Sequence, residues 1–127
     1  MTDRPFLDCF SGHAELYASA RPTYPASLIA EIAALAPGRR LAWDAGTGNG
    51  QAARLLAGHF EQVHATDASA QQVAQAASYP RVTFAAEPAE SCSLADASCD
   101  LVLVAQALHW FDLDPFFAEA RRVLKPR

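Results

Sequence analysis

A short apolar segment that ends in a carboxylate and runs into three alternating glycines constrains this chain more than any other feature. The segment reads LAWDAGTGNG, in which Asp44 and Ala45 lead directly into Gly46, Gly48 and Gly50. Glycine allows sharp turns and the close approach of a ligand, because it has no Cβ and tolerates positive φ. The pattern predicts a buried strand, a ligand-binding loop and a helix whose free N–H groups point at the ligand. The alternative is ordinary turn chemistry after a strand.

The ligand that suits this loop depends on the glycine spacing and on Asp44. The dinucleotide-binding fingerprint has its third glycine one residue later, where this chain has Gln51. A carboxylate just before the loop would also repel a diphosphate, whereas it suits a ligand that carries an ammonium group. Both details favour S-adenosylmethionine over a nicotinamide dinucleotide.

The loop resembles the first motif of the class I S-adenosylmethionine-dependent methyltransferases, most of all the type 11 group and its trans-aconitate-methylating relatives. Downstream, the segment VHATDAS reads as a second strand that ends in Asp67. An acid about 20 residues after such a loop binds ribose hydroxyls in related sheets. The resemblance therefore implies that Asp67, with Ala68 beside it, binds the cofactor. The alternative is that Asp67 and Ser69 cap the next helix.

Composition indicates a single domain with a small ligand. The 127 residues are 51% hydrophobic and 19% charged, with a net charge of -4, which is typical of one globular domain. Without a run of Lys or Arg, we expect a small-molecule substrate and neither a nucleic acid nor a membrane as partner. The first residues lack a signal-peptide pattern, so we expect a cytoplasmic protein. Cys9, Cys92 and Cys99 have no zinc-like spacing, and we expect neither a metal nor a disulfide.

Helix-like and strand-like patterns alternate along the chain, which predicts an α/β fold with a parallel sheet covered on both faces. The spacing of Ser69 and Gln72 is that of a capping box. We expect strands at residues 40–44, 62–67, 81–86 and 100–106, and helices at residues 25–36 and 51–60, from Ser69, and from Pro115 after a cap at Asp114.

The resemblance adds a topology to this pattern. It implies a Rossmann-like doubly wound sheet, the class I methyltransferase fold, with strand order 3-2-1-4-5-7-6, here truncated after the fourth strand and its helix. We expect a single domain overall, with a lid and first helix at residues 1–36 and an incomplete S-adenosylmethionine-binding core at residues 37–127. The outer edge of the fourth strand would then be unpaired, which predicts self-association through that edge.

The segment before the first predicted helix resembles the lid of small-molecule methyltransferases. By that resemblance Arg21 would pair with the methionine carboxylate of the cofactor, and Tyr17, one helical turn away, would help to close the pocket. The alternative is a surface arginine and a packing tyrosine.

Adenine recognition is expected in the turn after the third strand. Many relatives have an aspartate where this chain has Pro88, and a proline cannot accept the hydrogen bond of the adenine amino group. Ala89 could still donate its backbone N–H, and Glu87 or Glu90 could replace the lost acceptor. The alternative is that both glutamates are solvated turn residues.

The segment QALHWFD follows the fourth strand, at the edge where open parallel sheets bind ligands. By resemblance Gln106 and Ala107 would line the methionine side, and His109 and Trp110 would face the substrate. His109 could act as a general base. The alternatives are a histidine that is hydrogen-bonded to the backbone and a tryptophan that packs, with Phe111, in the core.

These features predict a methyltransferase that moves a methyl group from the sulfonium to a small-molecule acceptor by in-line displacement. The sulfonium is already activated, so the protein mainly has to orient the reactants and exclude water. Two alternatives stay open. One is a module of the same fold that binds the cofactor without catalysis, and the other is a fragment of a nucleotide-binding oxidoreductase.

Overall fold

Four parallel strands form one sheet in the computed structural model, which describes residues 25–105, 108 and 111–126. They are β1 Leu41–Ala45, β2 Gln62–Asp67, β3 Val82–Ala86 and β4 Leu101–Leu103. Their order is β3-β2-β1-β4, and each neighbouring pair is parallel. This arrangement confirms the predicted parallel sheet and the first four positions of the expected strand order.

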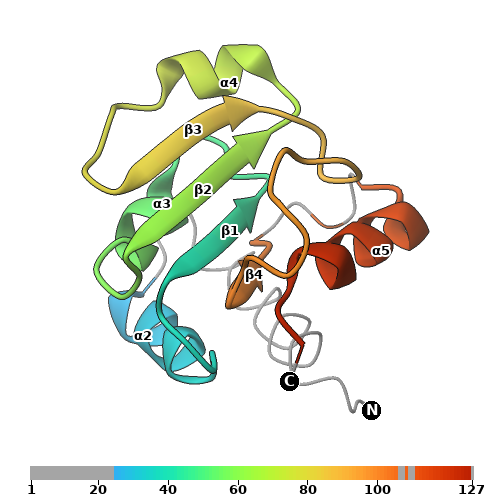
Figure 1. Ribbon diagram of the computed structural model, residues 1–127. Coiled ribbons are helices and arrows are strands. Elements are labelled where there is room, and N and C mark those ends of the chain that lie inside the picture. The colour runs from blue at the N-terminus through green and yellow to red at the C-terminus, as the bar shows by residue number, and fades with distance from the viewer. Residues whose placement is uncertain (1–24, 106–107, 109–110, 127) are drawn as a thin grey trace.

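Helices lie on both faces of this sheet, as a doubly wound fold requires. They are α2 Ala26–Ala34, α3 Gln51–Leu56, α4 Ala70–Gln75 and α5 Leu113–Val123. Figure 1 shows α2 and α3 behind the sheet and α5 on the opposite side, beside β4. The carboxyl ends of β1, β2 and β3 all point to one edge, where the three following loops gather (Figure 1).

Alternation along the strands divides the buried apolar side chains into two cores, one on each face of the sheet. On the first face, Ala42 and Val63 of the strands pack with α2 and α3. On the second face, Trp43 and Val102 pack with α5, whose Phe116 is fully buried. The Trp43 and Phe116 ring centroids are 5.9 Å apart. Because both faces of β4 are covered, this strand is apolar throughout, as the sequence indicates. β1 is covered on both faces as well, and Asp44 is the one polar residue in it.

Among the element boundaries that differ from the sequence-based expectation, those of α3 and β3 have a local cause. The helix expected to reach Phe60 ends at Leu56, because the next amides, those of Gly58 and His59, bond three residues back in a tighter turn. The strand expected from residue 81 begins at Val82, because Arg81 has φ 69°, outside the extended region.

The start of α5 also differs from the expectation. The helix begins at Leu113, with Asp112 in the cap position, so Asp114 and Pro115 both lie inside the first turn. Proline is tolerated there because the first amides of a helix have no intrahelical partner. The expected cap at Asp114 was therefore wrong, although its charge still lies near the positive end of the helix.

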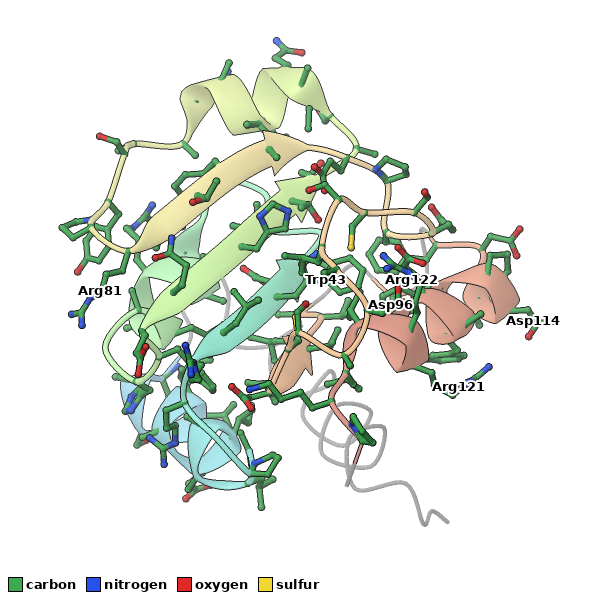
Figure 2. All side chains as sticks on the ribbon, in the orientation of Figure 1. Trp43, Arg81, Asp96, Asp114, Arg121 and Arg122 are labelled. Carbon is green, nitrogen blue, oxygen red and sulfur yellow. The ribbon has the colours of Figure 1, made fainter. Side chains whose placement is uncertain are left out.

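An ion pair at the end of α5 fixes the irregular segment between β3 and β4. Arg122 Nη1 lies 2.6 Å from Asp96 Oδ1, and its Nη2 donates to the carbonyls of Cys92 and Leu94. Figure 2 shows Arg122 turned toward Asp96, whereas Asp114 and Arg121 project away from the fold. Arg122 also bonds Glu119, and that hydrogen bond lowers the pKa of Glu119 to about 2.

The outer edge of β4 is partly covered by the chain that follows α5. Cys99 pairs in parallel with Leu124, and the amide of Lys125 donates to the carbonyl of Cys99 at 2.9 Å. Beyond that bridge, residues 101–103 pair only with β1 within the described part of the chain. The strand expected to run from residue 100 to 106 is thus shorter, and self-association through its edge stays a prediction. None of the described helices has the length and apolarity to cross a bilayer.

Candidate cofactor site

The glycine loop after β1 adopts the backbone that only glycine tolerates well. Gly46, Gly48 and Gly50 have φ values of 72°, 58° and 89°, all in the left-handed region. The amide of Thr47 donates to the carbonyl of Thr66 at 2.8 Å, which ties the loop to the end of β2. A Cβ on Gly48 would meet nothing within 4 Å, so this position faces open space. Along the loop, Gly46 and Gly48 are partly exposed and Asn49 is exposed, whereas Thr47 and Gly50 are buried.

Gly50 serves a different purpose from Gly48. A Cβ at residue 50 would lie 2.6 Å from the Phe84 ring of β3. The third glycine of the motif is thus required for close packing as well as for its positive φ, and α3 starts directly after it.

Asp44 lies beneath this loop and has almost no contact with solvent. Asp44 is only 1% exposed, and its Oδ2 accepts a hydrogen bond of 2.7 Å from the Thr47 hydroxyl. The pKa of Asp44 is raised to about 7: burial raises it most, the hydrogen bond from Thr47 lowers it, and the negative charge of Asp67 adds to the rise. In the structure Asp44 stabilises the glycine loop through its hydrogen bond with Thr47. Its expected contact with an ammonium group stays a prediction.

Asp67, at the end of β2, connects the loop to the next helix. Its Oδ2 accepts from the Gly48 amide and its Oδ1 from the Ser69 amide, both at 2.9 Å. Ser69 is the cap of α4, because its hydroxyl accepts from the Gln72 amide at 3.2 Å. Each carboxylate oxygen of Asp67 can still accept a further hydrogen bond. Asp67 therefore combines a structural role with a capacity to bind hydroxyl groups.

A pocket of about 170 Å³ opens at this carboxyl edge of the sheet. It is smaller than the roughly 300–1,000 Å³ of complete small-molecule sites, so it can hold only part of a cofactor. Its lining comes from the loops after β1, β2 and β3 and from the segment before α5, namely Gly46, Asp67, Ala68, Glu87, Ala89, Glu90 and Phe111.

The pocket brings together many of the residues expected from sequence, but not all. Gly46, Asp67, Ala68, Ala89 and Glu90 line it. The remaining loop positions support the site from below or beside it, and they are Asp44, Ala45, Gly48 and Gly50. The expected contacts of Tyr17, Arg21, Gln106 and His109, as well as those of Ala107 and Trp110, lie outside the described residues.

The turn after β3 presents both a donor and an acceptor to this pocket. Ala89 is 5% exposed, and its amide forms no hydrogen bond with any residue that the structure describes. Within the described residues this amide is therefore available as a donor to a ligand. Glu90 Oε2 accepts from the Asp112 amide at 2.7 Å, which holds the turn against the start of α5.

Glu87 is held by two neighbours that the sequence did not reveal as site residues. Its Oε1 accepts from the Ser93 amide at 3.1 Å and lies 3.2 Å from His64 Nε2. Burial raises the pKa of Glu87, but hydrogen bonds from Ser93 and His64 outweigh burial and leave the pKa below its ordinary value. Glu87 is therefore ionised and fixed. Thr47 and Phe111 were also not expected at the site, and no local pattern distinguishes them from ordinary loop and core residues.

A larger and more open hollow lies at the opposite edge of the sheet. Its volume is about 590 Å³, and its lining includes Arg40, Gln62 and Lys125 at the amino ends of the strands. Parallel sheets bind ligands at the carboxyl edge, where the loops can adapt without disturbing the strands. The smaller pocket is therefore the better candidate, because it combines that position with the Ala89 amide and the Asp67, Glu87 and Glu90 carboxylates in its lining residues.

The described residues offer neither a metal-binding cluster nor a reactive cysteine. No group of three or more His, Cys, Asp or Glu side chains within them could hold a metal ion. Cys92 and Cys99 are free thiols, and burial raises their pKa values to about 11 and about 12. At neutral pH both are protonated and unreactive.

Comparison with known proteins places this geometry in one family. The family described as "Methyltransferase domain" matches residues 43–127, which begin within β1 and include the glycine loop. The chain belongs to the class I S-adenosylmethionine-dependent methyltransferases. The resemblance of the glycine loop to the first motif of these enzymes is thus confirmed, and S-adenosylmethionine is the cofactor that the family supports.

Individual members of the family show the same relationship. The chain is 37% identical to a protein named as a methyltransferase in Dictyostelium discoideum, over 98% of this chain and 48% of that protein. It is 30% identical to a protein of Saccharomyces cerevisiae named as an S-adenosylmethionine-dependent methyltransferase, over 86% of this chain and 40% of that protein.

A solved structure extends the similarity to the fold. A type II methyltransferase of Anaeromyxobacter dehalogenans is 50% identical, with a TM-score of 0.80 over 84% of this chain and 46% of that one. The chain thus spans less than half the length of these relatives.

Proposed function

We propose that this chain forms the cofactor-binding part of a methyltransferase that acts on a small molecule. The observation that carries the proposal is the pocket at the carboxyl edge, which is lined by Gly46 of the glycine loop, by Asp67 and by Ala89. The net charge of -4 argues against an extended polyanionic substrate. The methyl acceptor is therefore expected to be a small molecule.

The residues of the pocket fit the cofactor by their hydrogen-bonding capacity. S-adenosylmethionine offers ribose hydroxyls and an adenine, together with an activated methyl group on its sulfonium. Asp67 has spare acceptor capacity for the hydroxyls, and the amide of Ala89, which has no partner among the described residues, can donate to a ring nitrogen. Pyrophosphate would be repelled by Asp67, Glu87 and Glu90, which all line the pocket.

The contribution of this chain to the reaction is binding and orientation. The loop and Asp67 fix one end of the cofactor, so that its methyl carbon is presented for in-line attack by the acceptor. Holding two reactants in such a geometry can contribute about 7–11 kcal/mol to a bimolecular reaction. No nucleophile of the protein is required, and His109 is proposed only as a base for the acceptor.

Calorimetric titration of the chain with S-adenosylhomocysteine and with NAD tests the proposal. We expect S-adenosylhomocysteine to bind and NAD not to bind, because the pocket has acceptors where a diphosphate would lie. Asp67→Ala should weaken binding of S-adenosylhomocysteine by about 1–3 kcal/mol, through the lost hydroxyl contacts.

Asp114→Ala is the matched control, because Asp114 is an exposed aspartate on α5 that points away from the fold (Figure 2). It should leave the affinity unchanged. Binding of NAD alone would contradict the cofactor assignment, and unchanged affinity in Asp67→Ala would reduce Asp67 to a structural brace. Transfer of a labelled methyl group to a panel of carboxylates, phenols and amines then separates a methyltransferase from a binding module.

A further inference from the structure

We propose that Arg122 and Glu119, near the C-terminal end of α5, are positioning residues for the pocket at the carboxyl edge, although neither lines it. The proposal rests on the proposed function, and it concerns how one side of the pocket is held in place. That side is the segment of residues 88–97, called the wall segment below, which lines the pocket through Ala89 and Glu90. The structure describes all of the wall segment, and no helix or strand lies within it.

The backbone of the wall segment bonds mainly to α5. The amide of Cys92 donates to Glu119 Oε2 at 2.8 Å. Arg122 Nη2 donates to the carbonyls of Cys92 and Leu94, at 3.3 and 2.8 Å. The amide of Ala97 donates to the carbonyl of Arg122 at 2.8 Å. Because backbone polar groups in a fold need partners, α5 serves the wall segment as a neighbouring strand would.

Arg122 and Glu119 also hold each other. Nε and Nη2 of Arg122 donate to the two carboxylate oxygens of Glu119, at 2.9 and 2.6 Å, which is a bidentate pair. The side chain of Glu119 is only 11% exposed, so the pair is shielded from the solvent that weakens surface ion pairs. Nη1 of Arg122 lies 2.6 Å from Asp96. One guanidinium therefore joins α5 to the wall segment at three points, Cys92, Leu94 and Asp96.

The other end of α5 reaches the pocket itself. Phe111, just before the helix, lines the pocket, and the amide of Asp112 donates to Glu90 Oε2 at 2.7 Å. Ala89 belongs to the same apolar core as Phe116 of the helix. The helix has 11 residues, so its two ends lie about 16 Å apart. α5 thus holds the wall segment both beside the pocket and far from it.

These contacts make the position of the pocket side depend on the far end of α5. Without them the wall segment would keep its bonds beside the pocket, but it would sample further positions. A ligand that binds only one of those positions has its apparent affinity reduced by the fraction of molecules that adopt it. Loss of the Arg122 contacts should therefore weaken binding in a chain that is still folded.

Arg122→Gln tests the inference, because glutamine has neither the charge nor the planar fork of arginine. Calorimetric titration with S-adenosylhomocysteine, well below the unfolding temperature of the variant, should show an affinity lowered by ~5-fold or more. The matched control is Arg121→Gln, the same exchange at the neighbouring residue, which is exposed and projects away from the fold (Figure 2). It should leave the affinity unchanged.

Hydrogen exchange, followed by peptide mass spectrometry, distinguishes a displaced wall segment from a general loss of stability. In Arg122→Gln, exchange in residues 88–97 should accelerate by a larger factor than exchange in β1 and β2. Saturating S-adenosylhomocysteine should slow it again, because the ligand selects the bound position of the wall segment. A purely structural role would accelerate exchange in the wall segment and in the sheet by the same factor.

Two further variants complete the test. Arg122→Lys keeps the charge without the fork, so it should restore part of the affinity lost in Arg122→Gln. Glu119→Gln serves if Arg122→Gln does not fold. A single amide oxygen then replaces two carboxylate oxygens that accept three hydrogen bonds, so the affinity should also fall. Its matched control is Glu61→Gln, at an exposed residue beside the opposite edge of the sheet, which should bind as the natural chain does.

The outcomes separate this inference from the proposed function. If the natural chain binds S-adenosylhomocysteine and folded Arg122→Gln binds it equally well, the inference is overturned and the proposed function stands. An equal loss of affinity in Arg121→Gln overturns the inference in the same way. Failure of the natural chain to bind S-adenosylhomocysteine overturns both.

Discussion

Asp44 and Asp100 are two buried aspartates near opposite edges of the same sheet, and their surroundings differ sharply. Asp100, just before β4, accepts from the amides of Arg40 and Leu41 and forms an ion pair of 3.1 Å with Lys125. Asp44, near the end of β1, accepts one hydrogen bond from the described part of the chain, that of the Thr47 hydroxyl. At the amino edge, the hydrogen-bonding capacity of the Asp100 carboxylate is therefore well used. At the carboxyl edge, the described residues use less of the capacity of the Asp44 carboxylate.

The pKa values follow this difference. Burial raises the pKa of Asp100, but hydrogen bonds from Arg40, Lys125 and Leu41 outweigh burial and hold it below its ordinary value. Burial raises the pKa of Asp44 to about 7, and a single hydroxyl does not offset it. The carboxylate at the amino edge thus contributes stability, whereas the carboxylate at the carboxyl edge lowers stability next to the candidate cofactor site.

The largest expected effect comes from removing the satisfied carboxylate. Asp100→Ala should lower the free energy of unfolding by about 3–5 kcal/mol, because it leaves two backbone amides without their acceptor and Lys125 without its partner. Because the folded pKa is lowered, the stabilisation is present above the ordinary aspartate pKa of 3.8 and is lost as the pH falls through the folded pKa. Urea unfolding at pH 7 measures the effect, and a change below 1 kcal/mol would contradict the contrast between the edges.

Replacing the carboxylate of Asp44 should change the free energy of unfolding in the opposite direction. Asp44→Asn should raise the free energy of unfolding at pH 8, by about 2–4 kcal/mol, because it removes a buried charge while Thr47 can still donate to the amide oxygen. With a folded pKa of about 7 against 3.8, the natural chain loses stability as the pH rises through this window, so the gain should vanish near pH 4.

Asp114→Asn, at an exposed site on α5, provides the control for the pH series. It should change stability little at either pH. A gain in Asp44→Asn that is equal at pH 4 and pH 8 would show that packing, and not the charge of Asp44, is responsible.

The smallest expected effects concern one glycine at each edge. Gly38→Ala should destabilise by about 1–3 kcal/mol, because its Cβ would lie 2.6 Å from Asp100 Oδ1, whose carboxylate is already fixed by backbone amides. Gly48→Ala should cost about 1–2 kcal/mol, since its Cβ meets open space and only the positive φ of 58° opposes it. Urea unfolding measures the free energy of unfolding of both variants. A larger loss in Gly48→Ala than in Gly38→Ala would contradict the expected order.

The sequence predicted the features of this molecule that depend on local pattern. The glycines after an apolar strand, the acid at position 67 and the alternation of helices and strands all lie within short windows. Such windows determine backbone geometry directly, because glycine, capping residues and apolar runs have strong local preferences. The sheet, the loop and the placement of Asp67 at the pocket could therefore be predicted.

Contacts between distant segments could not be predicted in the same way. His64 and Ser93 are 29 residues apart, and they meet only because β2 and β3 pair in one particular register. The positive φ of Arg81 and the shift of α5 to Leu113 depend likewise on how neighbouring elements pack. Glu87 could be suggested as an acceptor from the sequence, but the partners that fix it required the structure.

The bond between the Gly48 amide and Asp67 has a consequence for the kinetics of recognition. It joins the ends of two neighbouring strands before any ligand arrives, and Ser69 holds the same carboxylate from the other side. An incoming molecule thus meets a preorganised rim and loses mainly its own freedom on arrival. Differences in affinity between related ligands should then lie in how long each one remains bound, and much less in how fast it arrives.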